Sequence, residues 1–544
     1  MKSILIYIFI FFSVFSFGQN NEQKEFLVCY SQVWGFLKYF HPEPSKKDWD
    51  KYLIEDYEKL LTCNSRLEFN QIISDLINEC GNYKFKKRDI ADSLIFRESF
   101  SWLNNSLINK KNHSYLTQLR NNKPEFKNKY ISKAPSGNPK ITNENSYGNY
   151  RYNPSIHYLS ITRYWNIINY FCPNRNIIPE NWTQVFKNNI YDFITANNYE
   201  DYYFAVRKMT TEIRDGHGFI RTENNPIDKY KYTPFYCTGL SDGYFINAVL
   251  QDSLQSIDLK RMDRIISING EPVEYKIRQV GNFLSTSNDY YLSKATRYLR
   301  ITNQDSITLA IDRDGNRVIR TYSTMDKETL KSRFRPTKAS PQKSPYKFLK
   351  DSISGKEYCY INMGRLKRSD INREFKRKLM SNDNLIIDSR NYPNWTLIKL
   401  SKLLIEGRSK FAKFIAMDFD YPGSYKWTQS QTIGNKKKGY EGKIYVLVDY
   451  NTMSQAEYTV MAFQQHSNTT VIGGQTAGAD GNVSEIQLPF GIKSVFSGLG
   501  VFYPDGTPAQ QVGVKRDYEV LQSSSYLQGK DLILEKALEL IRNK

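Results

Sequence analysis

The chain has 544 residues, of which 40% are hydrophobic and 14% aromatic. This length allows about three or four domains of roughly 150 residues each, and the composition excludes a wholly disordered protein because it can fill packed cores. The formal charge of +20 comes from Lys and Arg that are scattered among acidic residues. Such scatter favours a solvated basic surface over a nucleic-acid-binding face.

The first 18 residues have the order of a secretory signal peptide. Lys2 precedes an apolar run over 4–17, and small residues lead to a cleavage point near Gly18. The run is shorter than the ~20 residues that span a bilayer, and no second long apolar run follows, so a membrane anchor is the less favoured interpretation. We therefore expect an exported protein, periplasmic or secreted, with no integral membrane segment after signal cleavage.

A duplication marks the N-terminal part of the chain. Residues 34–42 and 165–173 share Trp, Tyr, Phe and Pro at the same offsets, and a second Trp follows each copy, Trp49 or Trp182. Apolar and aromatic residues recur at helical spacing in both copies, and the Pro of each copy ends its helix because it cannot continue one. We predict two related helical units whose aromatic residues pack in the core.

The middle of the chain, from about 230 to 325, has the alternation of β-strands. Residues 243–249 alternate as one strand, and the Asn-Gly step at 269–270 is a strong signal for a tight turn between strands. A hairpin is predicted around the Asp-Gly step at 314–315. The sequence therefore predicts a small β domain after the helical units.

The last third of the chain alternates strands with helices. Residues 385–388, 444–448 and 469–472 are apolar runs rich in β-branched side chains, and helical stretches occur at 397–404 and 456–464. Buried strands that alternate with helices predict an α/β core with a largely parallel sheet.

Ser454 lies where the second of these strands gives way to a helix. The strand ends at residue 448, a short polar turn follows, and a helix begins near Ser454. This order presents the hydroxyl at the C-terminal edge of the sheet, where backbone N–H groups at a helix N-terminus stabilise an oxyanion. A Ser beside a helix start is more often a cap than a nucleophile, so the segment alone leaves both interpretations open.

Four segments together resemble the C-terminal-processing and tricorn-core serine peptidases, the tail-specific protease superfamily. Residues 454–457 resemble the family's S-x-[SA]-E nucleophile segment, and 473–478 resembles its G-x-x-T-x-G segment. Residues 388–390 resemble the start of D-x-R-x-N-x-G-G, and 510–517 resembles the late G-[VI]-x-P-D segment. The segments occur in the family's order and spacing.

The resemblance extends to the β domain, where residues 263–270 stand at the GD-x-I-x-x-ING core of a PDZ domain, with Met262 in place of the usual Gly. It implies a multidomain fold of N-terminal helical repeats, a PDZ-like β domain and an α/β catalytic core of the ClpP/crotonase-like type. The predicted units are a signal peptide (1–18), helical unit 1 (19–120), a linker rich in Asn, Lys, Ser and Pro (121–150), helical unit 2 (151–229), the PDZ-like domain (230–330) and the peptidase core (331–544).

The same resemblance implies catalytic roles. Ser454 is the implied nucleophile, and Ala479 occupies the position of the Lys base of the C-terminal-processing branch, so a Ser–Lys dyad is excluded there. The tricorn-type branch uses a His before the PDZ domain, and His217 in a D-G-H segment matches it. The Glu that orients this His in tricorn-like enzymes corresponds to Gln510, which can accept an imidazole N–H but carries no charge. Asp215 and Glu485 are less favoured orienters.

The implied oxyanion hole combines the N–H of Gln455 with an N–H from the turn after Asp388, where Asn394 replaces a family Gly. The chain departs from the family pattern at Tyr392, Asn394, Trp395, Gln510 and Arg516. We therefore expect an exported serine endopeptidase that forms an acyl-enzyme on Ser454. The departures motivate an alternative, a catalytically weak or inactive peptide-binding protein on the same scaffold. A third interpretation is an envelope scaffold that binds partners through its helical repeats.

The sequence gives no sign of a cofactor. It contains no Walker loop and no acidic or His cluster with ligand spacing, and its six cysteines form no CxxC pair. The expected partner is a peptide or unfolded protein substrate, and export argues further against a nucleic acid. Disulfide bonds are chemically possible after export, although no pairing follows from the spacing.

Overall fold

The computed structural model describes residues 21–81, 83–87, 90–98, 100–178, 181–250, 257–333 and 344–543. The predicted signal peptide, 1–18, lies outside the described residues. Across the described ranges, no helix combines the length and the apolar character needed to cross a membrane. All six cysteines are buried as free thiols.

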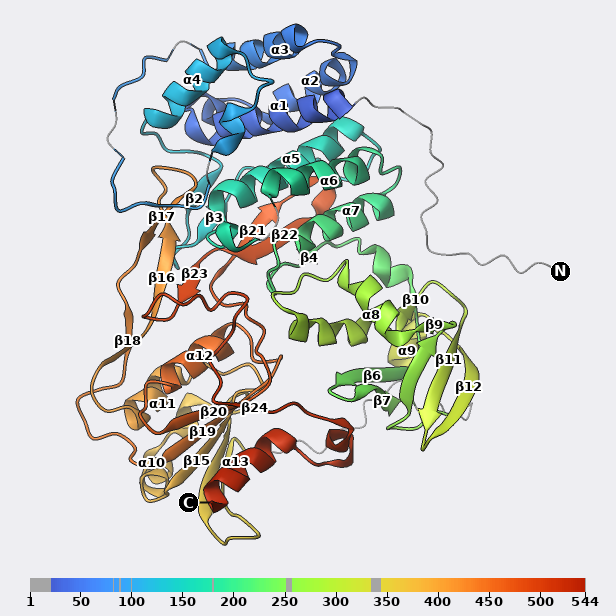
Figure 1. Cartoon of the computed structure of the whole chain (residues 1–544), viewed down its shortest axis with the longest axis vertical. Coiled ribbons are helices and arrows are strands. Elements are labelled where there is room, and N and C mark those ends of the chain that lie inside the picture. Colours follow the sequence, from blue (N-terminus) through green and yellow to red (C-terminus); the bar gives the residue numbers. More distant parts are fainter. Residues whose placement is uncertain are drawn as a thin grey trace, which may run out of the picture.

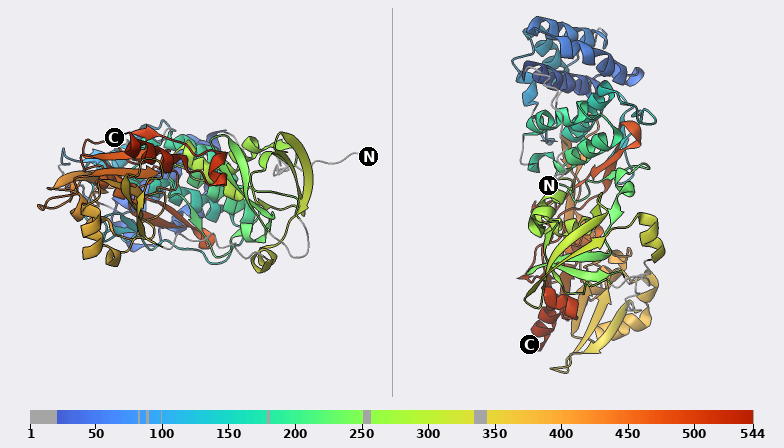
Figure 2. Two further views of the ribbon diagram at one scale, coloured as in Figure 1. Left: turned by 90° about the horizontal axis from the view of Figure 1, so that it is seen from below. Right: turned by 90° about the vertical axis from the view of Figure 1, so that its right-hand side faces the viewer.

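Helices from both predicted units stack at one end of an elongated molecule, away from the α/β core (Figures 1 and 2). The first unit contributes α1 (Asn21–Phe40), α2 (Asp50–Thr62), α3 (Arg66–Asn78) and α4 (Lys110–Asn121), and the second contributes α5 (Pro154–Phe171), α6 (Trp182–Ile194) and α7 (Tyr199–Thr211). The central helices α1 and α5 pack against each other, which explains why they are buried almost all round rather than on one face.

The two helical units contain the same reciprocal tryptophan contact. Trp34 Nε1 donates to the carbonyl of Trp49 at 3.0 Å, and Trp49 Nε1 donates to the carbonyl of Trp34 at 3.1 Å. Trp165 and Trp182 repeat the pair of bonds at 2.7 and 3.0 Å. All four side chains are buried, so the bonds satisfy the indole N–H groups inside an apolar core, as the sequence predicts for these residues.

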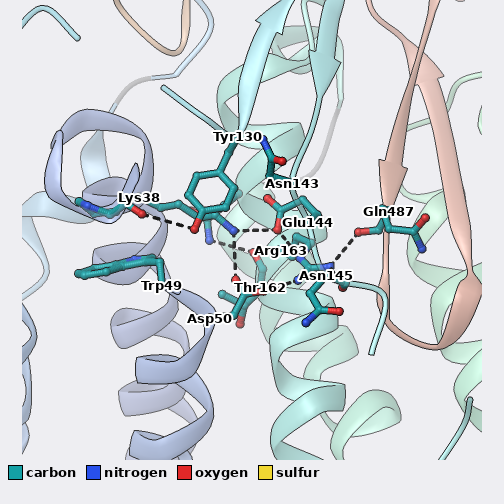
Figure 3. A network of polar contacts seen from close by, with 12 residues as sticks. Lys38, Trp49, Asp50, Tyr130, Asn143, Glu144, Asn145, Thr162, Arg163 and Gln487 are labelled. Carbon is teal, nitrogen blue, oxygen red and sulfur yellow. Dashed lines mark hydrogen bonds and ion pairs between the residues drawn. The ribbon is translucent and has the colours of Figure 1, made fainter. Parts of the chain in front are cut away.

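A buried ionic cluster joins the two units (Figure 3). Lys38 of α1 lies 3.2 Å from Asp50 and 2.8 Å from Glu144. Arg163 of α5 lies 2.6 Å from Asp50 and 2.8 Å from Glu144. Because each charge meets two opposite charges, the electrostatic attraction offsets much of the cost of removing all four groups from water.

The segment 121–150, predicted to be a linker, is instead packed into the fold. Its strands β2 (Ile131–Lys133) and β3 (Pro139–Ile141) pair as a hairpin, and Glu144 completes the ionic cluster. Asn138 Nδ2 donates to the carbonyl of Val483 at 2.9 Å, which ties the hairpin to a distant strand. The polar composition suggested a linker because these contacts use single residues and leave no periodic apolar pattern.

A six-stranded antiparallel sheet forms the middle of the chain (lower right in Figure 1). It contains β6 (Phe235–Leu240), β7 (Gly243–Val249), β8 (Arg264–Ile268), β9 (Glu271–Pro272), β11 (Ser306–Arg313) and β12 (Asn316–Ser323). Helix α8 (Val273–Gly281) and the 3₁₀ helix η5 (Asp289–Tyr298) pack against it. The strand predicted over 243–249 and both predicted turns are confirmed, since the β11–β12 register leaves only 314–315 between the strands.

The last part of the chain builds a second six-stranded sheet, β13-β14-β15-β19-β20-β24. Its strands are β13 (Tyr346–Lys350), β14 (Glu357–Asn362), β15 (Asn384–Asp388), β19 (Lys443–Val448), β20 (Thr469–Gly473) and β24 (Tyr518–Glu519). All pairings are parallel except that of β13 with β14, so the predicted α/β core is confirmed.

Both faces of this sheet are covered, which is why its strands are apolar without alternation. Helices α10 (Arg373–Met380), α11 (Leu397–Leu404) and α12 (Gln455–Phe463) share one core, and α13 (Leu532–Arg542) shares the other. Along β15, Leu385 and Ile387 point into the first core and Ile386 into the second.

Two further sheets connect the core to the helical units. One contains β16 (Ser409–Met417), β17 (Ser424–Trp427), β18 (Gln431–Ile433), β23 (Gly500–Phe502) and, from the first helical unit, β1 (Ile95–Phe96). The other contains β21 (Val483–Gln487), β22 (Lys493–Ser497) and β4 (Ile220–Arg221). Because β4 follows α7, the last helix of the second helical unit, its pairing with β22 brings the 214–220 segment to the core.

Shorter elements complete the chain. They are β5 (Lys231–Tyr232), which pairs with β10 (Ile301–Thr302), and helix α9 (Lys327–Arg333).

Candidate active site

Ser454 occupies a strained turn between strand β19 and helix α12. Its backbone has φ 58° and ψ −124°, a conformation that non-glycine residues rarely adopt. Two bonds from its N–H hold the turn, one to the carbonyl of Ala479 at 2.9 Å and one to Glu457 Oε2 at 3.1 Å. A sharp strand-to-helix turn of this kind exposes a serine hydroxyl at the edge of a sheet, as in a nucleophile elbow.

Glu457 is the centre of the hydrogen bonds around this turn. Its fully buried carboxylate accepts from the N–H groups of Ser454, Gly478 and Ala479 at 3.1, 2.7 and 3.0 Å, and from Thr476 Oγ1 at 2.6 Å. Burial raises the pKa of Glu457, and these four donors act in the opposite direction. The carboxylate therefore joins two segments of the sequence, 454–457 and 473–478, at one place.

His217 lies in the loop between α7 and β4 and is 7% exposed. Its Nδ1 lies 2.9 Å from the hydroxyl oxygen of Ser497, at the end of β22. That hydroxyl donates to Asp215 Oδ1 at 3.0 Å, and the backbone N–H of Ser497 donates to Asp215 Oδ2 at 2.6 Å. The three side chains thus form a chain of hydrogen bonds from carboxylate to hydroxyl to imidazole.

This chain of bonds determines which ring nitrogen of His217 carries the proton. A hydroxyl has one proton, and Ser497 uses it in the hydrogen bond that it donates to Asp215. The same oxygen therefore accepts a hydrogen bond from Nδ1–H of the ring. The neutral imidazole then has an unprotonated Nε2, the form that can accept a proton. Burial lowers the pKa of His217, the charge of Lys294 lowers it further, and the charge of Asp215 opposes the change.

Gln510 joins this series of hydrogen bonds at Asp215 and does not bond to His217. Its Nε2 donates to Asp215 Oδ1 at 3.1 Å, and the ring of His217 bonds to Ser497 instead. Sequence reasoning placed Gln510 directly on the imidazole and gave Asp215 less weight, whereas the structure places Asp215 between them. Glu485 lies elsewhere, 2.9 Å from Lys493 in an ion pair on β21 and β22.

The His217 loop packs against residues on both sides of the Ser454 turn. A Cβ at Gly216 would lie 2.9 Å from the Cβ of Ala479 and 3.7 Å from the Cε of Met453, so only glycine allows this approach. Among the described residues, Ser454 and His217 form no direct hydrogen bond. Catalytic hydrogen bonds are often long in a ligand-free site and shorten when substrate binds.

The antiparallel domain supplies polar side chains that hold these loops. The N–H of Gly216 donates to Ser287 Oγ at 2.7 Å, and Asn288 Nδ2 donates to the carbonyls of Thr476 and Ala477 at 2.9 and 3.2 Å. Sequence reasoning missed this role because a short polar stretch between helices has the composition of any loop.

The candidate oxyanion-hole residues lie at one edge of the parallel sheet. The N–H of Gln455 is at the start of α12, where unpaired helix N–H groups point outward. Thr452 Oγ1 donates to the carbonyl of Ser389 at 2.9 Å, so the loop after β15 meets the turn before the helix. Asn394, further along that loop, is exposed and donates from Nδ2 to the carbonyl of Gly364 at 2.8 Å. Gln455 directly follows Ser454 and begins α12, and the bond to Gly364 involves the side chain of Asn394 and not its backbone N–H.

A metal centre is not indicated. The described residues contain no group of three or more His, Cys, Asp and Glu side chains that could hold an ion. The arrangement offers a hydroxyl on a strained turn, a buried neutral imidazole and helix N–H donors, which together suit acyl transfer.

Comparison with known proteins agrees with this chemistry. The family model described as "Peptidase family S41" matches residues 357–520, a range that includes Ser454 and Gln510 but not the helical units or His217. The structure of mature CPAF complexed with lactacystin has a TM-score of 0.57 at 13% identity, over 72% of this chain and 98% of that chain. A structure of mature CPAF has a TM-score of 0.56 at 13% identity, over 72% and 97%. At this identity the likeness establishes a shared fold, and no curated protein matches the chain.

Proposed function

The S41 family model matches residues 357–520 and supports a serine-type peptidase, and from this premise we propose that the chain is an exported endopeptidase of this family that cleaves peptides or unfolded proteins. The reaction proceeds through an acyl-enzyme on Ser454. The observation that carries this proposal is the strained Ser454 backbone at a strand–helix turn, held by the Glu457 carboxylate.

His217 is the general base of the proposed reaction. Its Nε2 takes the proton of the Ser454 hydroxyl as the oxygen attacks the scissile carbonyl, and it returns the proton to the leaving amine. The imidazolium formed in this step keeps its Nδ1–H bond to Ser497, and the charge of Asp215 stabilises it through that hydroxyl. Water then attacks the acyl-enzyme, with Nε2 again as base.

The oxyanion of the tetrahedral intermediate is bound by backbone donors. The N–H of Gln455 is one, next to the nucleophile and at the positive end of α12. A second N–H comes from the loop after β15, at or near Asn394. The contact between Thr452 and Ser389 supports this assignment because it brings that loop to the Ser454 turn.

The remaining parts of the chain have supporting roles. The antiparallel sheet with α8 supports the assignment of a PDZ-like domain, which would bind an extended peptide by adding a strand to a sheet edge. The matching tryptophan pairs support the assignment of the helical units as repeats. The basic and apolar start of the sequence supports export.

A second candidate function is a peptide-binding protein without turnover. The lack of a direct Ser454–His217 hydrogen bond among the described residues and the uncharged Gln510 favour it. In this case the same site would hold a peptide, and the base would not reach the hydroxyl.

A fluorophosphonate probe separates the two functions because it labels only an activated serine. We expect the purified chain to be labelled and to cleave an unstructured protein, and we expect Ser454→Ala to lose both properties. Ser381→Ala, at an exposed serine after α10, is the matched control and should keep both. A folded wild-type chain that is neither labelled nor active would favour the binding protein.

A further inference from the structure

A pocket of about 360 Å³ lies between the antiparallel domain and the turn that leads to Ser454. Strands β6 and β7 and helix η5 supply most of its wall, and Tyr450 closes it from the side of the α/β core. Since Tyr450 is in the turn between β19 and Ser454, the pocket is next to the proposed nucleophile along the chain. The proposed reaction leaves this pocket without a role.

Three basic residues line the pocket, and no acidic residue does. Lys294 and Arg297 are three residues apart on η5, so both lie on one face because a 3₁₀ helix has three residues per turn. Arg300 follows η5 and lines the same wall. Within the described part of the chain, neither Arg297 nor Arg300 forms a salt bridge.

The pocket also contains polar atoms that lack a partner. Both atoms are buried: among the described residues, Arg300 Nε donates no hydrogen bond and Asn247 Oδ1 accepts none. The guanidinium of Arg300 stacks over the ring of Tyr236, with Cζ 3.9 Å from the ring centroid, and this contact fixes the orientation of the guanidinium. A preoriented guanidinium with an unused donor is suited to a planar acceptor such as a carboxylate.

Lys294 connects the pocket with the nucleophile. Its Nζ lies 3.9 Å from the sulfur of Met453, the residue before Ser454. Burial lowers the pKa of Lys294 to about 8, and the charge of Arg297 contributes to the decrease. The charges of Asp449 and Glu457 act in the opposite direction. A bound anion would favour the charged form of this lysine and so would itself be bound more tightly.

We propose that this pocket binds a carboxylate of the peptide substrate and selects acidic peptides for cleavage close to the acidic residue. The proposal rests on the peptidase function of Ser454, because the ligand is taken to be the peptide that reaches it. The carboxylate is that of an Asp or Glu side chain, which presents a planar acceptor to the pocket's basic donors.

Binding measured without turnover tests the proposal. Fluorescence anisotropy of the full chain carrying Ser454→Ala would be recorded with peptides that differ only in Glu or Gln at one position, each as free acid and as C-terminal amide. We expect each Glu peptide to bind about tenfold or more tightly than its Gln partner, as one charge-assisted contact provides. Preference for Glu in the amides supports the proposal, whereas a preference only for the free acid over the amide would identify the C-terminus and overturn it.

Variants of the pocket locate the effect. Arg297→Gln, at an exposed position, should reduce the affinity ratio of the carboxylate peptide to its neutral partner, and Arg297→Lys should retain part of it. Arg320→Gln, on the outer strand β12, is the matched control and should leave the ratio unchanged. Equal affinities for all four peptides, or a ratio that Arg297→Gln does not change, would overturn the proposal.

Cleavage by the wild-type chain is scored separately. Cleavage of neutral and acidic peptides at equal rates would keep the proposed peptidase and overturn the carboxylate pocket. A carboxylate preference in binding, without cleavage of any peptide, would keep the pocket and overturn the peptidase.

Discussion

The hydroxyl of Ser497 lies 2.9 Å from Nδ1 of His217 and donates its own hydrogen bond to Asp215. This relationship gives the imidazole one tautomer, with Nε2 unprotonated, and connects it to a carboxylate that does not contact it within hydrogen-bond distance, since Asp215 Oδ1 is 3.9 Å from Nδ1. The imidazole of His217 is therefore oriented by the Ser497 hydroxyl, and the charge of Asp215 acts on the ring through that hydroxyl.

Removal of that hydroxyl should slow catalysis without unfolding the protein. We expect Ser497→Ala to lower kcat by about 10²–10⁴, the range that general-base catalysis provides, because the ring loses the acceptor that sets its tautomer. KM should change little, since Ser497 does not reach the substrate. Ser497→Thr keeps the hydroxyl and serves as the control. An unchanged kcat in a folded Ser497→Ala variant would contradict the assignment.

The acid limb of the pH profile should lie below the ordinary pKa of histidine. Burial lowers the pKa of His217 from 6.5, so the base stays neutral as pH falls through 6.5 and becomes protonated only at lower pH. We expect kcat/KM to be constant from pH 8 to about 6.5 and then to decrease. In Asp215→Asn the opposing charge is lost, so the midpoint should move to still lower pH. A wild-type midpoint above 6.5 would exclude His217 as the group observed.

The elements that carry Ser454 could be predicted because their signals are local. A buried strand at 443–448, a polar turn and helix α12 are consecutive in the sequence, and the β-branched run and the helix start identify them. The predicted helix at 397–404 agrees with α11 to the residue for the same reason. His217 required more than local signals, because its neighbours in the structure come from β22 and the antiparallel domain.

The polar contacts of the site could not be predicted from the sequence. Ser497 and Asp215 are 282 positions apart, and nothing in the residues around either one indicates the other. The position of Gln510 suggested contact with the imidazole, whereas its amide reaches Asp215. Glu144 shows the same limit in the helical units, since one buried carboxylate in a polar segment has no periodic signal.

The Glu457 carboxylate should be essential to the shape of the Ser454 turn. Glu457→Gln replaces one acceptor oxygen by an NH₂ group, which faces N–H donors and leaves at least one of them unsatisfied. Each buried unsatisfied group costs about 1–3 kcal/mol, so we expect a loss of stability of that size in urea unfolding, together with lost probe labelling. Labelling at the wild-type rate would contradict the role of Glu457 in positioning the nucleophile.

The ionic cluster of the helical units should contribute to stability far more than a surface ion pair. Lys38→Met leaves Asp50 and Glu144 facing Arg163 alone in a buried site, and we expect a loss of about 3–5 kcal/mol in the free energy of unfolding. Lys51→Met removes an exposed ion pair on α2 and should cost less than about 1 kcal/mol. Similar effects of the two variants in urea unfolding would show that the cluster is not desolvated.

Replacement of Gln510 by the family's Glu distinguishes the two views of this position. If residue 510 acted on the imidazole directly, Gln510→Glu would add a favourable charge and raise activity. The structure predicts the reverse, because the new carboxylate would face Asp215 where the amide N–H now donates at 3.1 Å. Two carboxylates at that distance cannot both ionise without cost, so one of them must bind a proton.

We therefore expect Gln510→Glu to lower both kcat and the free energy of unfolding at pH 8. The loss of stability should become smaller toward pH 5, since protonation of the pair restores a hydrogen bond between residue 510 and Asp215. Urea unfolding at the two pH values measures this, and Gln511→Glu, at the neighbouring half-buried position, is the control for an added charge. A more active and equally stable Gln510→Glu variant would show that the amide does not lie on Asp215 in the working enzyme.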